Sequence, residues 1–207
     1  MKIICVGHNY DSHNLEMDRM SSEDDHIVIF LKPDSALLTN DKKQFYIPDF
    51  SSNIHYEVEL VVKIDKMGKN IAQRFAYRYY SEITLGIDLT ARDIQDDLKK
   101  KGLPWEISKG FDNSAVVGQF VPKEKYGKEI NDLHFELTKN GQTVQKATTS
   151  DMIHSVDAII SYVSRFFTLK TGDLIFTGTP AGVGRVEIND YLQATLETDK
   201  LLDLYVC

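Results

Sequence analysis

Cysteine is scarce in this chain, and long apolar runs are missing from it. The two cysteines, Cys5 and Cys207, stand at opposite ends of 207 residues. Two thiols without metal-ligand spacing predict neither a disulfide framework nor a zinc site, and they indicate a reducing compartment, which we expect to be the cytoplasm. No run approaches the roughly 18 apolar residues of a membrane span, and residues 1–7 lack the features of a signal peptide. We therefore expect no membrane partner.

Positive charge is also in deficit. The formal net charge is −7, which argues against a surface that binds nucleic acid electrostatically. The composition is that of an ordinary globular protein, with 42% hydrophobic and 27% charged residues. A chain of this length buries a full core without disulfides. Because no repeat or low-complexity tract indicates a linker, we expect residues 1–207 to form a single domain.

The most informative stretch is residues 55–62, His-Tyr-Glu-Val-Glu-Leu-Val-Val. Its polar and apolar residues alternate, which predicts a half-buried strand with Glu57 and Glu59 on one face. Two solvated carboxylates on a surface strand would explain the pattern, because glutamate is seldom buried without a partner. The alternative is a pair of oxygen ligands for a hard divalent cation, whose charge would remove the repulsion between them. A third carboxylate from elsewhere would complete such a site.

Three further places supply candidate groups. Asp88 ends an apolar strand pattern and precedes a predicted helix, so its side chain either caps a turn or projects into a cleft. Lys109, in a loop rich in glycine and polar residues, is either solvated or a fixed cation for a carboxylate or a developing enolate. Residues 178–184 contain three glycines, which predict a tight turn or backbone N–H groups brought close to an anion.

Residues 11–26 are polar and predict either a solvated surface loop or a mobile lid over a cleft. His13 and Glu16 stand three residues apart, so a helical turn would place them side by side as an acid–base pair. The apolar run 27–31 that follows predicts a buried strand. Lys32 would then be a solvated strand end or, alternatively, a residue that faces a site.

The remaining patterns are structural. Thr90 and Asp93 resemble a capping box at the start of a helix that Gly102 ends. Residues 71–79 have the spacing of a short helix, and residues 156–167 that of a core helix capped by Ser155. Asn140-Gly141 between two strand patterns predicts a hairpin.

Taken in order, these motifs resemble the fumarylacetoacetate hydrolase family. The ordered set is Glu57-Val58-Glu59, Asp88, Lys109 and residues 178–184, and it covers nearly the whole chain. Residues 88–95 and 99–105 are similar to the branch that contains acylpyruvate hydrolases and oxaloacetate decarboxylases. The family often has arginine at position 8, where this chain has histidine.

The resemblance implies an α+β, β-rich fold, a mixed folded β-roll with a few short helices. It implies a homodimer and a Mg²⁺ or Mn²⁺ site, in which Ca²⁺ can substitute. The metal would be held by Glu57, Glu59 and Asp88. The catalytic groups would be the lid pair His13 and Glu16 together with Lys109, and the groups that bind substrate would be Arg92, Gln95, Lys109, Gly178 and Thr179.

The activity that we expect from this resemblance is metal-dependent hydrolysis of the C–C bond of a 3-acylpyruvate, a small 2-oxo acid, to pyruvate and a carboxylic acid. Oxaloacetate decarboxylation would share the same enolate. An isomerase or decarboxylase of the 2-hydroxy-dienedioates of aromatic breakdown is the alternative within the family. A metal-binding β-module without catalysis is the alternative of another class.

Overall fold

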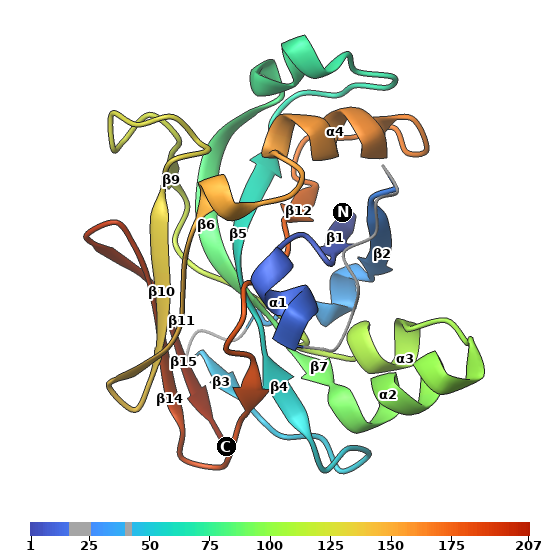
Figure 1. The fold of residues 1–207 in the computed structure, drawn as a ribbon, viewed down its shortest axis with the longest axis vertical. Helices are drawn as coiled ribbons and strands as arrows, with labels where there is room; N and C mark the ends of the chain where they lie inside the picture. The colour runs from blue at the N-terminus through green and yellow to red at the C-terminus, as the bar shows by residue number, and fades with distance from the viewer. Residues whose placement is uncertain (17–25, 40–42) are drawn as a thin grey trace.

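The strands of the protein form a curled roll with short helices at its rim (Figure 1). The structure, a computed structural model, describes residues 1–16, 26–39 and 43–207. It confirms the expected fold class, α+β and rich in strands.

The larger of the sheets has seven strands in the order β2-β1-β12-β5-β6-β8, with β9 also pairing to β6. The pair β1–β12 is parallel, whereas β12–β5 and β5–β6 are antiparallel. The strands are β1 (Ile3–Gly7), β2 (Val28–Lys32), β5 (Val58–Ile64), β6 (Tyr80–Asp88), β8 (Ala115–Val117), β9 (Val121–Pro122) and β12 (Leu174–Phe176).

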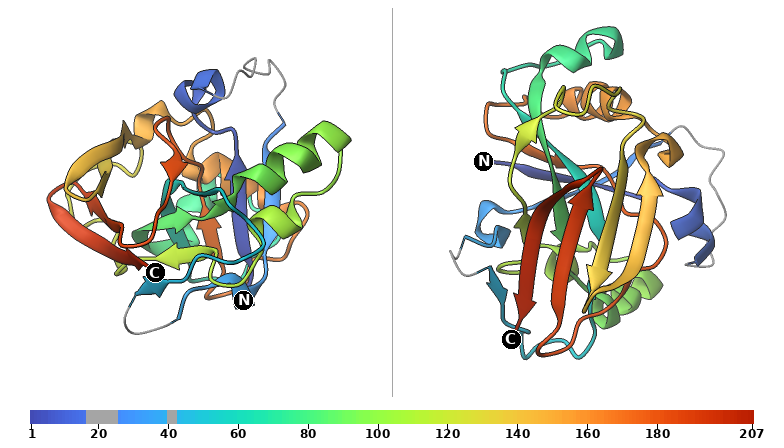
Figure 2. Two further views of the ribbon diagram at one scale, coloured as in Figure 1. Left: turned by 90° about the horizontal axis from the view of Figure 1, so that it is seen from below. Right: turned by 90° about the vertical axis from the view of Figure 1, so that its left-hand side faces the viewer.

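A five-stranded sheet in the order β11-β10-β14-β15-β3 closes the other side of the roll (Figure 2, right). A small sheet, β13-β4-β7, lies near the ends of β5 and β6. These strands are β3 (Gln44–Phe45), β4 (Ile54–Tyr56), β7 (Thr90–Ala91), β10 (His134–Lys139), β11 (Gln142–Thr148), β13 (Gly184–Arg185), β14 (Tyr191–Leu196) and β15 (Asp199–Val206).

The helices are short and lie outside the roll (Figure 1). α2 and α3 lie beside β7, α4 packs with the 3-10 helix Gln73–Arg78 at the opposite end, and α1 directly follows β1 and Tyr10. The α-helices are α1 (Asp11–Glu16), α2 (Arg92–Lys101), α3 (Glu106–Lys109) and α4 (Val156–Ser164); two further 3-10 helices span Asp34–Ala36 and Thr149–Asp151. No described helix has the length and apolar character needed to cross a membrane.

The apolar face of β5 lies at the centre of the core. Val58, Leu60 and Val62 have no exposed surface and share one cluster with Leu192 and Ala194 of the facing sheet. Burial of such side chains contributes about 1.5–3 kcal/mol each. The predicted alternation of faces is confirmed, with the two glutamates on the other face. The stretch is not half-buried as predicted, however, because that second face is buried too, and a break at Glu57 divides it into β4 and β5.

Two local predictions hold without change. Asn140 and Gly141 join β10 to β11 with φ of 52° and 80°, the positive pair that a tight hairpin turn requires. α4 begins after Ser155, whose hydroxyl accepts a hydrogen bond from the Ala158 N–H at 3.3 Å. The helix ends at Ser164, earlier than the apolar pattern suggests.

Other local predictions are wrong, each for a physical reason. β2 is an outer strand whose Val28 and Leu31 are 37% and 38% exposed, because an apolar run alone does not distinguish an edge from a centre. The predicted capping box at the start of α2 does not form, since the Asp93 carboxylate accepts from Ser51 Oγ at 2.6 Å instead. By contrast, the short helix predicted within residues 71–79 is present, as a 3-10 helix over residues 73–78.

Candidate metal centre and active site

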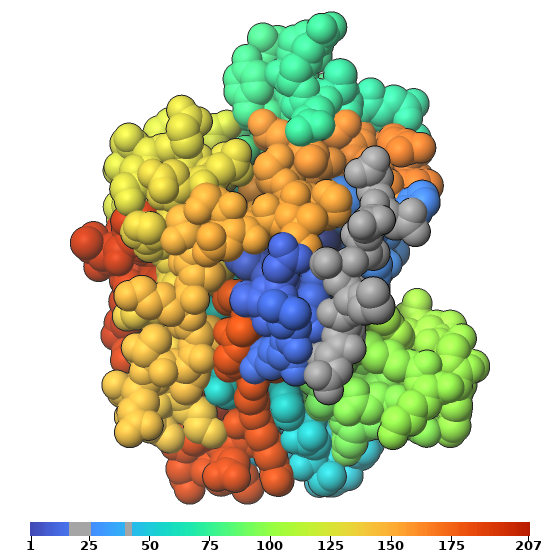
Figure 3. All heavy atoms as spheres, in the orientation of Figure 1, coloured from blue at the N-terminus to red at the C-terminus, as the bar shows by residue number. Residues whose placement is uncertain are grey.

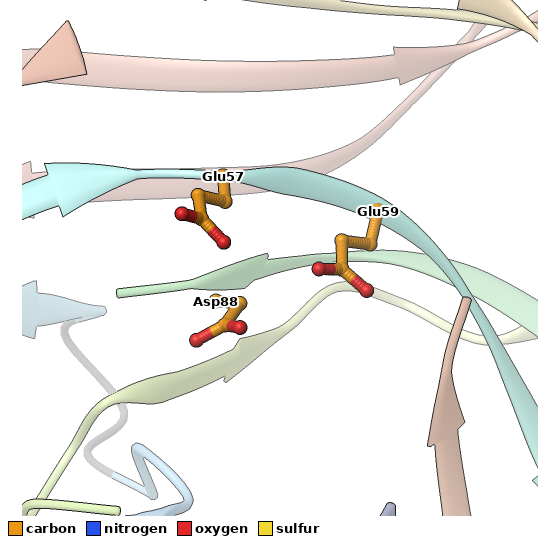
Figure 4. A group of neighbouring side chains, drawn as sticks. All are labelled: Glu57, Glu59 and Asp88. Carbon is orange, nitrogen blue, oxygen red and sulfur yellow. The ribbon is translucent and has the colours of Figure 1, made fainter. Parts of the chain in front are cut away.

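Three carboxylates meet where β5 and β6 pair (Figure 4). Glu57 occupies the break between β4 and β5, Glu59 lies within β5, and Asp88 is the last residue of β6. Because the Asp88 N–H donates to the Glu57 carbonyl at 2.8 Å, the two residues lie opposite each other across the strand pair. One oxygen from each carboxylate lies within 4.8 Å of the other two. The side chains are buried, which excludes the solvated alternative for the two glutamates.

Glu57 is paired with two cations. Its Oε1 accepts a hydrogen bond from Arg92 Nη2, and its Oε2 accepts from Lys109 Nζ at 2.7 Å. Burial alone would raise the pKa of this carboxyl, but Lys109 and Arg92 outweigh burial and hold it well below its usual range. Glu57 is therefore ionised even in the absence of a dication.

Glu59, two residues away, has the opposite environment. Its carboxylate accepts from the Gly178 N–H at 2.7 Å, and it forms no ion pair within the described residues. Burial and the neighbouring carboxylates of Asp88 and Glu57 raise its pKa well above the ordinary value. A bound dication would offset this shift, because it supplies the positive charge that Glu59 lacks.

Asp88 lies between two lysines. Lys109 Nζ is 2.7 Å from Oδ2, and Lys32 Nζ is 2.7 Å from Oδ1. Lys32 also donates to the Ser114 carbonyl at 3.1 Å and to Ser114 Oγ at 3.0 Å. Its ammonium therefore joins the outer strand β2 to the loop that follows α3.

Sequence reasoning missed Lys99 and Trp105, which line the cavity, and left Lys32 open between a solvated strand end and a residue that faces a site. Lys32 is only 2% exposed and pairs with Asp88, so the second alternative holds. The available signal was its place in the segment Phe30-Leu31-Lys32-Pro33, where a charged residue directly follows an apolar run.

Lys109 is the last residue of the short helix α3, and its ammonium contacts two of the three carboxylates. Besides Glu57 and Asp88, its ammonium donates to Thr90 Oγ1 at 2.7 Å. Burial disfavours its charge, but Asp88 and Glu57 more than compensate, so that its pKa is raised. A lysine held charged at this point can stabilise negative charge that develops on a ligand.

The donor set fits a hard divalent cation. Three buried carboxylates, one of them without a cationic partner, match the oxygen ligands that Mg²⁺ and Mn²⁺ prefer. Lys109 and Arg92 offset part of the negative charge of the three carboxylates, because they form ion pairs with Glu57 and Asp88. The ligand prediction for Glu57, Glu59 and Asp88 is thus consistent with the geometry.

The predicted lid pair lies on one helical turn at the mouth of the site. His13 Nδ1 is 3.5 Å from Glu16 Oε2 in α1, longer than a well-formed hydrogen bond. Burial lowers the pKa of His13, so that the imidazole is neutral near pH 7 and able to accept a proton. Figure 3 shows these N-terminal residues, in blue, at the centre of the face. The remaining residues of the predicted lid, 17–25, lie outside the described residues.

The glycines of residues 178–184 bring N–H groups to carboxylates of the protein itself. Gly178 donates to Glu59, and Gly182 donates to both oxygens of Glu16 at 3.1 Å. Their φ angles are 100° and 97°, and a Cβ on Gly182 would lie 2.1 Å from the Val144 carbonyl oxygen. This close approach explains the need for glycine.

The predicted substrate residues share a cavity with the carboxylates. Arg92 Nη1 donates to Gln95 Oε1 at 2.5 Å, and Thr179 Oγ1 accepts from Gln145 Nε2 at 2.9 Å. The cavity is lined by Val6, Gly7, His8, His13, Phe30, Glu57, Glu59, Asp88, Arg92, Gln95, Lys99, Trp105, Lys109 and Thr179. Two predicted site residues are not among the lining residues. Gly178, predicted to bind substrate, donates to Glu59, and Glu16, predicted to be catalytic, lies beside His13.

Comparisons with known proteins show the family to which the chain belongs. The family model described as fumarylacetoacetate (FAA) hydrolase C-terminal matches residues 2–202. The chain is 44% identical to bovine oxaloacetate tautomerase FAHD1, mitochondrial, over 93% of this chain and 85% of that protein. It is 41% identical to the mitochondrial oxaloacetate decarboxylase of Dictyostelium discoideum, over 98% of this chain and 93% of that protein.

A solved structure extends the likeness to three dimensions. Fumarylpyruvate hydrolase from Pseudomonas aeruginosa, in complex with Mn²⁺ and pyruvate, is 34% identical with a TM-score of 0.91, over 100% of this chain and 89% of that one. The protein therefore belongs to the fumarylacetoacetate hydrolase family, as its ordered motifs predicted. Its relatives include enzymes named for reactions of oxaloacetate and of fumarylpyruvate.

Proposed function

We propose that the protein is a Mg²⁺- or Mn²⁺-dependent hydrolase of the C–C bond of a 3-acylpyruvate, and that it also decarboxylates oxaloacetate. The observation that carries the proposal is the meeting of three buried carboxylates with a charged lysine and a neutral histidine in one cavity. The Mn²⁺ and pyruvate in the name of the Pseudomonas relative support both the metal and the product. The relatives named for oxaloacetate support the second reaction.

In the proposed hydrolysis, different residues bind the metal, transfer the proton and stabilise the enolate. A dication on Glu57, Glu59 and Asp88 would supply Lewis-acid charge for the 1-carboxylate and 2-oxo oxygens of the substrate. His13, oriented by Glu16, accepts a proton from water, and the hydroxide attacks the distal carbonyl carbon. The bond from that carbon to C3 then breaks, and its electron pair forms pyruvate enolate, which Lys109 stabilises. The proton held by His13 returns to C3, giving pyruvate and the second carboxylic acid.

Tautomerisation of oxaloacetate is a second candidate, favoured by the name of the bovine relative. It needs the same base, which moves the C3 proton, and the same enolate-stabilising lysine, but neither a water nucleophile nor cleavage of a C–C bond. Decarboxylation passes through the enolate as well, with loss of CO₂ instead of attack by water. One site is therefore able to serve all three reactions, and their relative rates must be measured.

The test is a screen of short 2,4-dioxo acids, oxaloacetate and a hydroxymuconate-type diene with Mg²⁺ or Mn²⁺, with products followed by NMR. We expect cleavage of a dioxo acid that stops when the metal is chelated. The E82Q variant, at a partly exposed ion pair with Lys63, provides a control that leaves turnover intact. Turnover of every compound at the buffer rate would instead favour the metal-binding module without catalysis, and conversion of the diene alone would favour the isomerase.

We further propose that the protein is a homodimer, as the family resemblance implies. A groove of about 950 Å³ runs along β2 and α3, and the outer strand β2 leaves one edge of the larger sheet unpaired within the described residues. Leu31, Phe50 and Ile107 at this groove are 38%, 53% and 64% exposed. Such a patch supports burial by a second copy. We expect sedimentation to give a dimer and I107E to give a monomer, with I188E, at another exposed isoleucine, unchanged; a monomeric parent protein would refute the assignment.

We propose that the protein acts in the cytoplasm. Scarce cysteine supports the cytoplasm, whereas the bovine relative is named as mitochondrial. Fractionation of the source cells would decide between them.

A further inference from the structure

Gln145, a buried residue of β11, connects the five-stranded sheet to the site. Its Oε1 accepts a hydrogen bond from the Val58 N–H at 2.9 Å, and its Nε2 donates to Thr179 Oγ1 at 2.9 Å and to the Pro180 carbonyl at 3.0 Å. Val58 directly follows the predicted metal ligand Glu57, and Thr179 lines the cavity. The side chain therefore joins the strand that carries the ligands to the loop that follows β12.

The partners of Gln145 determine which end of its amide is the nitrogen. A backbone N–H only donates, so the amide atom that faces Val58 is the oxygen. A backbone carbonyl only accepts, so the amide atom that faces Pro180 is the nitrogen. These two partners leave a single orientation of the amide. Because the same nitrogen faces Thr179 Oγ1, this hydroxyl oxygen must accept the hydrogen bond.

The hydroxyl hydrogen of Thr179 is then left for another partner. A hydroxyl has one hydrogen to donate, and the contact with Gln145 uses only a lone pair of its oxygen. Among residues 1–16, 26–39 and 43–207, no hydrogen bond is donated by this hydroxyl. Thr179 is 4% exposed, so little solvent reaches it. A buried donor without an acceptor is costly, which indicates that the acceptor arrives with a ligand.

The acceptor that fits this position is a carboxylate oxygen. Thr179 shares the cavity with the three carboxylates that would hold the dication, so a ligand on the metal lies within the same enclosure. The proposed substrates bind the metal through a carboxylate and the adjacent oxo group. A carboxylate is the strongest acceptor in such a molecule, because hydrogen bonds to an ionised group are roughly twice as strong as neutral ones.

We propose that Gln145 is a positioning residue for the substrate: it holds the Thr179 hydroxyl with its hydrogen directed into the cavity, where it donates to the carboxylate of the bound 2-oxo acid. The inference rests on the proposed function and deepens it, because it assigns a protein donor and the residue that orients this donor. Without Gln145 the hydroxyl rotates freely and presents a lone pair to the carboxylate part of the time. Gln145 thus contributes to affinity by preorganisation, without touching the ligand.

The test is a double-mutant cycle on pyruvate binding, measured by calorimetry with the Mn²⁺-loaded protein. Pyruvate is the proposed product and is not cleaved further. Q145M should weaken binding by ~3- to 10-fold, the cost of ordering a free rotor. T179V should weaken it by ~10- to 100-fold, as loss of a hydrogen bond to a charged group implies. Q145M should have no further effect in the T179V background, because Gln145 acts through the hydroxyl. An equal effect of Q145M in both backgrounds would overturn the proposal.

Controls separate this role from a purely structural one. Q142M, at an exposed glutamine of the same strand, should bind pyruvate as the parent protein does. T179S keeps the hydroxyl and should keep most of the affinity. Affinity for Mn²⁺ alone should be the same in Q145M and the parent protein. A loss of Mn²⁺ affinity in Q145M would show that Gln145 acts through Val58 and Glu57 instead, and would overturn the proposal.

A second variant covers the case in which Q145M does not fold. Q145E keeps the shape and the acceptor for Val58, but it presents an oxygen to Thr179 and so turns the hydroxyl hydrogen away from the cavity. Q145E should weaken pyruvate binding more in the parent protein than in T179V, and equal losses would overturn the proposal.

The binding measurements are also independent of turnover. Absence of turnover with every oxo acid would refute the proposed function but leave the binding cycle standing. Failure of the parent protein to bind pyruvate would refute the role of Gln145, whatever the turnover.

Discussion

Lys32 and Asp88 form an ion pair from which solvent is excluded: Nζ lies 2.7 Å from Oδ1, and both side chains have no exposed surface. Asp88 has Lys109 as its other cation. The aspartate thus has a lysine on either side, one from the edge of the larger sheet and one from the site. Only Lys109 also touches Glu57, which makes Lys32 a positioning residue for Asp88.

K32M should destabilise the protein by about 3–5 kcal/mol, because removal of one partner leaves a buried charge less compensated. Added Mn²⁺ should raise the Tm of K32M by more than it raises that of the parent protein, since the dication replaces part of the lost charge. Thermal unfolding with and without Mn²⁺ measures both effects. The control K63M breaks a partly exposed pair with Glu82 and should cost about 1 kcal/mol or less. Similar losses in the two variants would show that Lys32 has no special role.

The two glutamates of the site should respond in opposite directions to removal of their charge. E57Q breaks a buried carboxylate with two cationic partners, and we expect it to lower stability. E59Q removes a carboxyl whose charged form is disfavoured by burial, Asp88 and Glu57, and we expect it to stabilise the metal-free protein above neutral pH. Urea unfolding of the metal-free proteins tests this difference of sign, and both variants should lose the Mn²⁺-dependent rise in Tm and metal-dependent turnover.

The pH dependence of the same measurement follows from the direction of the shift. The pKa of Glu59 is raised in the folded protein, so the folded state holds a proton that the unfolded state has released. Stability of the metal-free protein therefore falls as pH rises from the unfolded pKa toward the folded one. The gap between E59Q and the parent protein should widen over that interval. A constant gap would mean that Glu59 is ionised throughout.

K109M should lower kcat/KM by ~10²-fold or more, because loss of a charge aimed at a developing enolate has a cost of that size. Steady-state kinetics with the substrate found in the screen measures it. The variant also leaves Glu57 and Asp88 without their shared cation, so it must be compared at a temperature where circular dichroism shows it folded. An unchanged kcat/KM would remove Lys109 from the reaction.

H13A should reduce hydrolysis more than it reduces substrate binding, because the proposed role of His13 is proton transfer. The base must be unprotonated, and burial lowers its pKa, so activity should persist below pH 6.5 and decline as pH falls through the lowered value. The pH profile of kcat in the parent protein and in H13A gives the measurement. An acid limb that is identical in both would assign it to another group.

The sequence was sufficient for the site wherever local pattern and chemistry agree. Period-2 alternation places Glu57 and Glu59 on one face, and three residues of helical spacing bring His13 to Glu16. The roles of the other predicted site residues, such as Asp88 and Lys109, came from the resemblance to the family motifs. The facing of the two glutamates and the pairing of His13 with Glu16 depend only on residues that are close together in the chain. The metal-ligand prediction depends on the preference of hard cations for carboxylate oxygens.

Features that depend on contacts between residues far apart in the chain could not be predicted from the sequence pattern. Lys32 is buried because β2 pairs with β1 and directs its last side chain inward, toward Asp88 56 residues further on. Thr90 and Asp93 have the composition of a cap, but Lys109 and Ser51 compete for their oxygens. Neither competitor is visible in a window around the helix.

The parallel pairing of β1 with β12 bears on the order of folding during synthesis. Ile3 pairs with Leu174, whereas the ligand strands β5 and β6 are neighbours in both sequence and space. A ribosome must release nearly the whole chain before β12 can insert between β1 and β5, and contacts of such separation slow folding. β5 and β6 are able to pair much earlier, as a nascent hairpin that brings Glu57 to Asp88. These two carboxylates therefore come together before β1 has β12 as its neighbour.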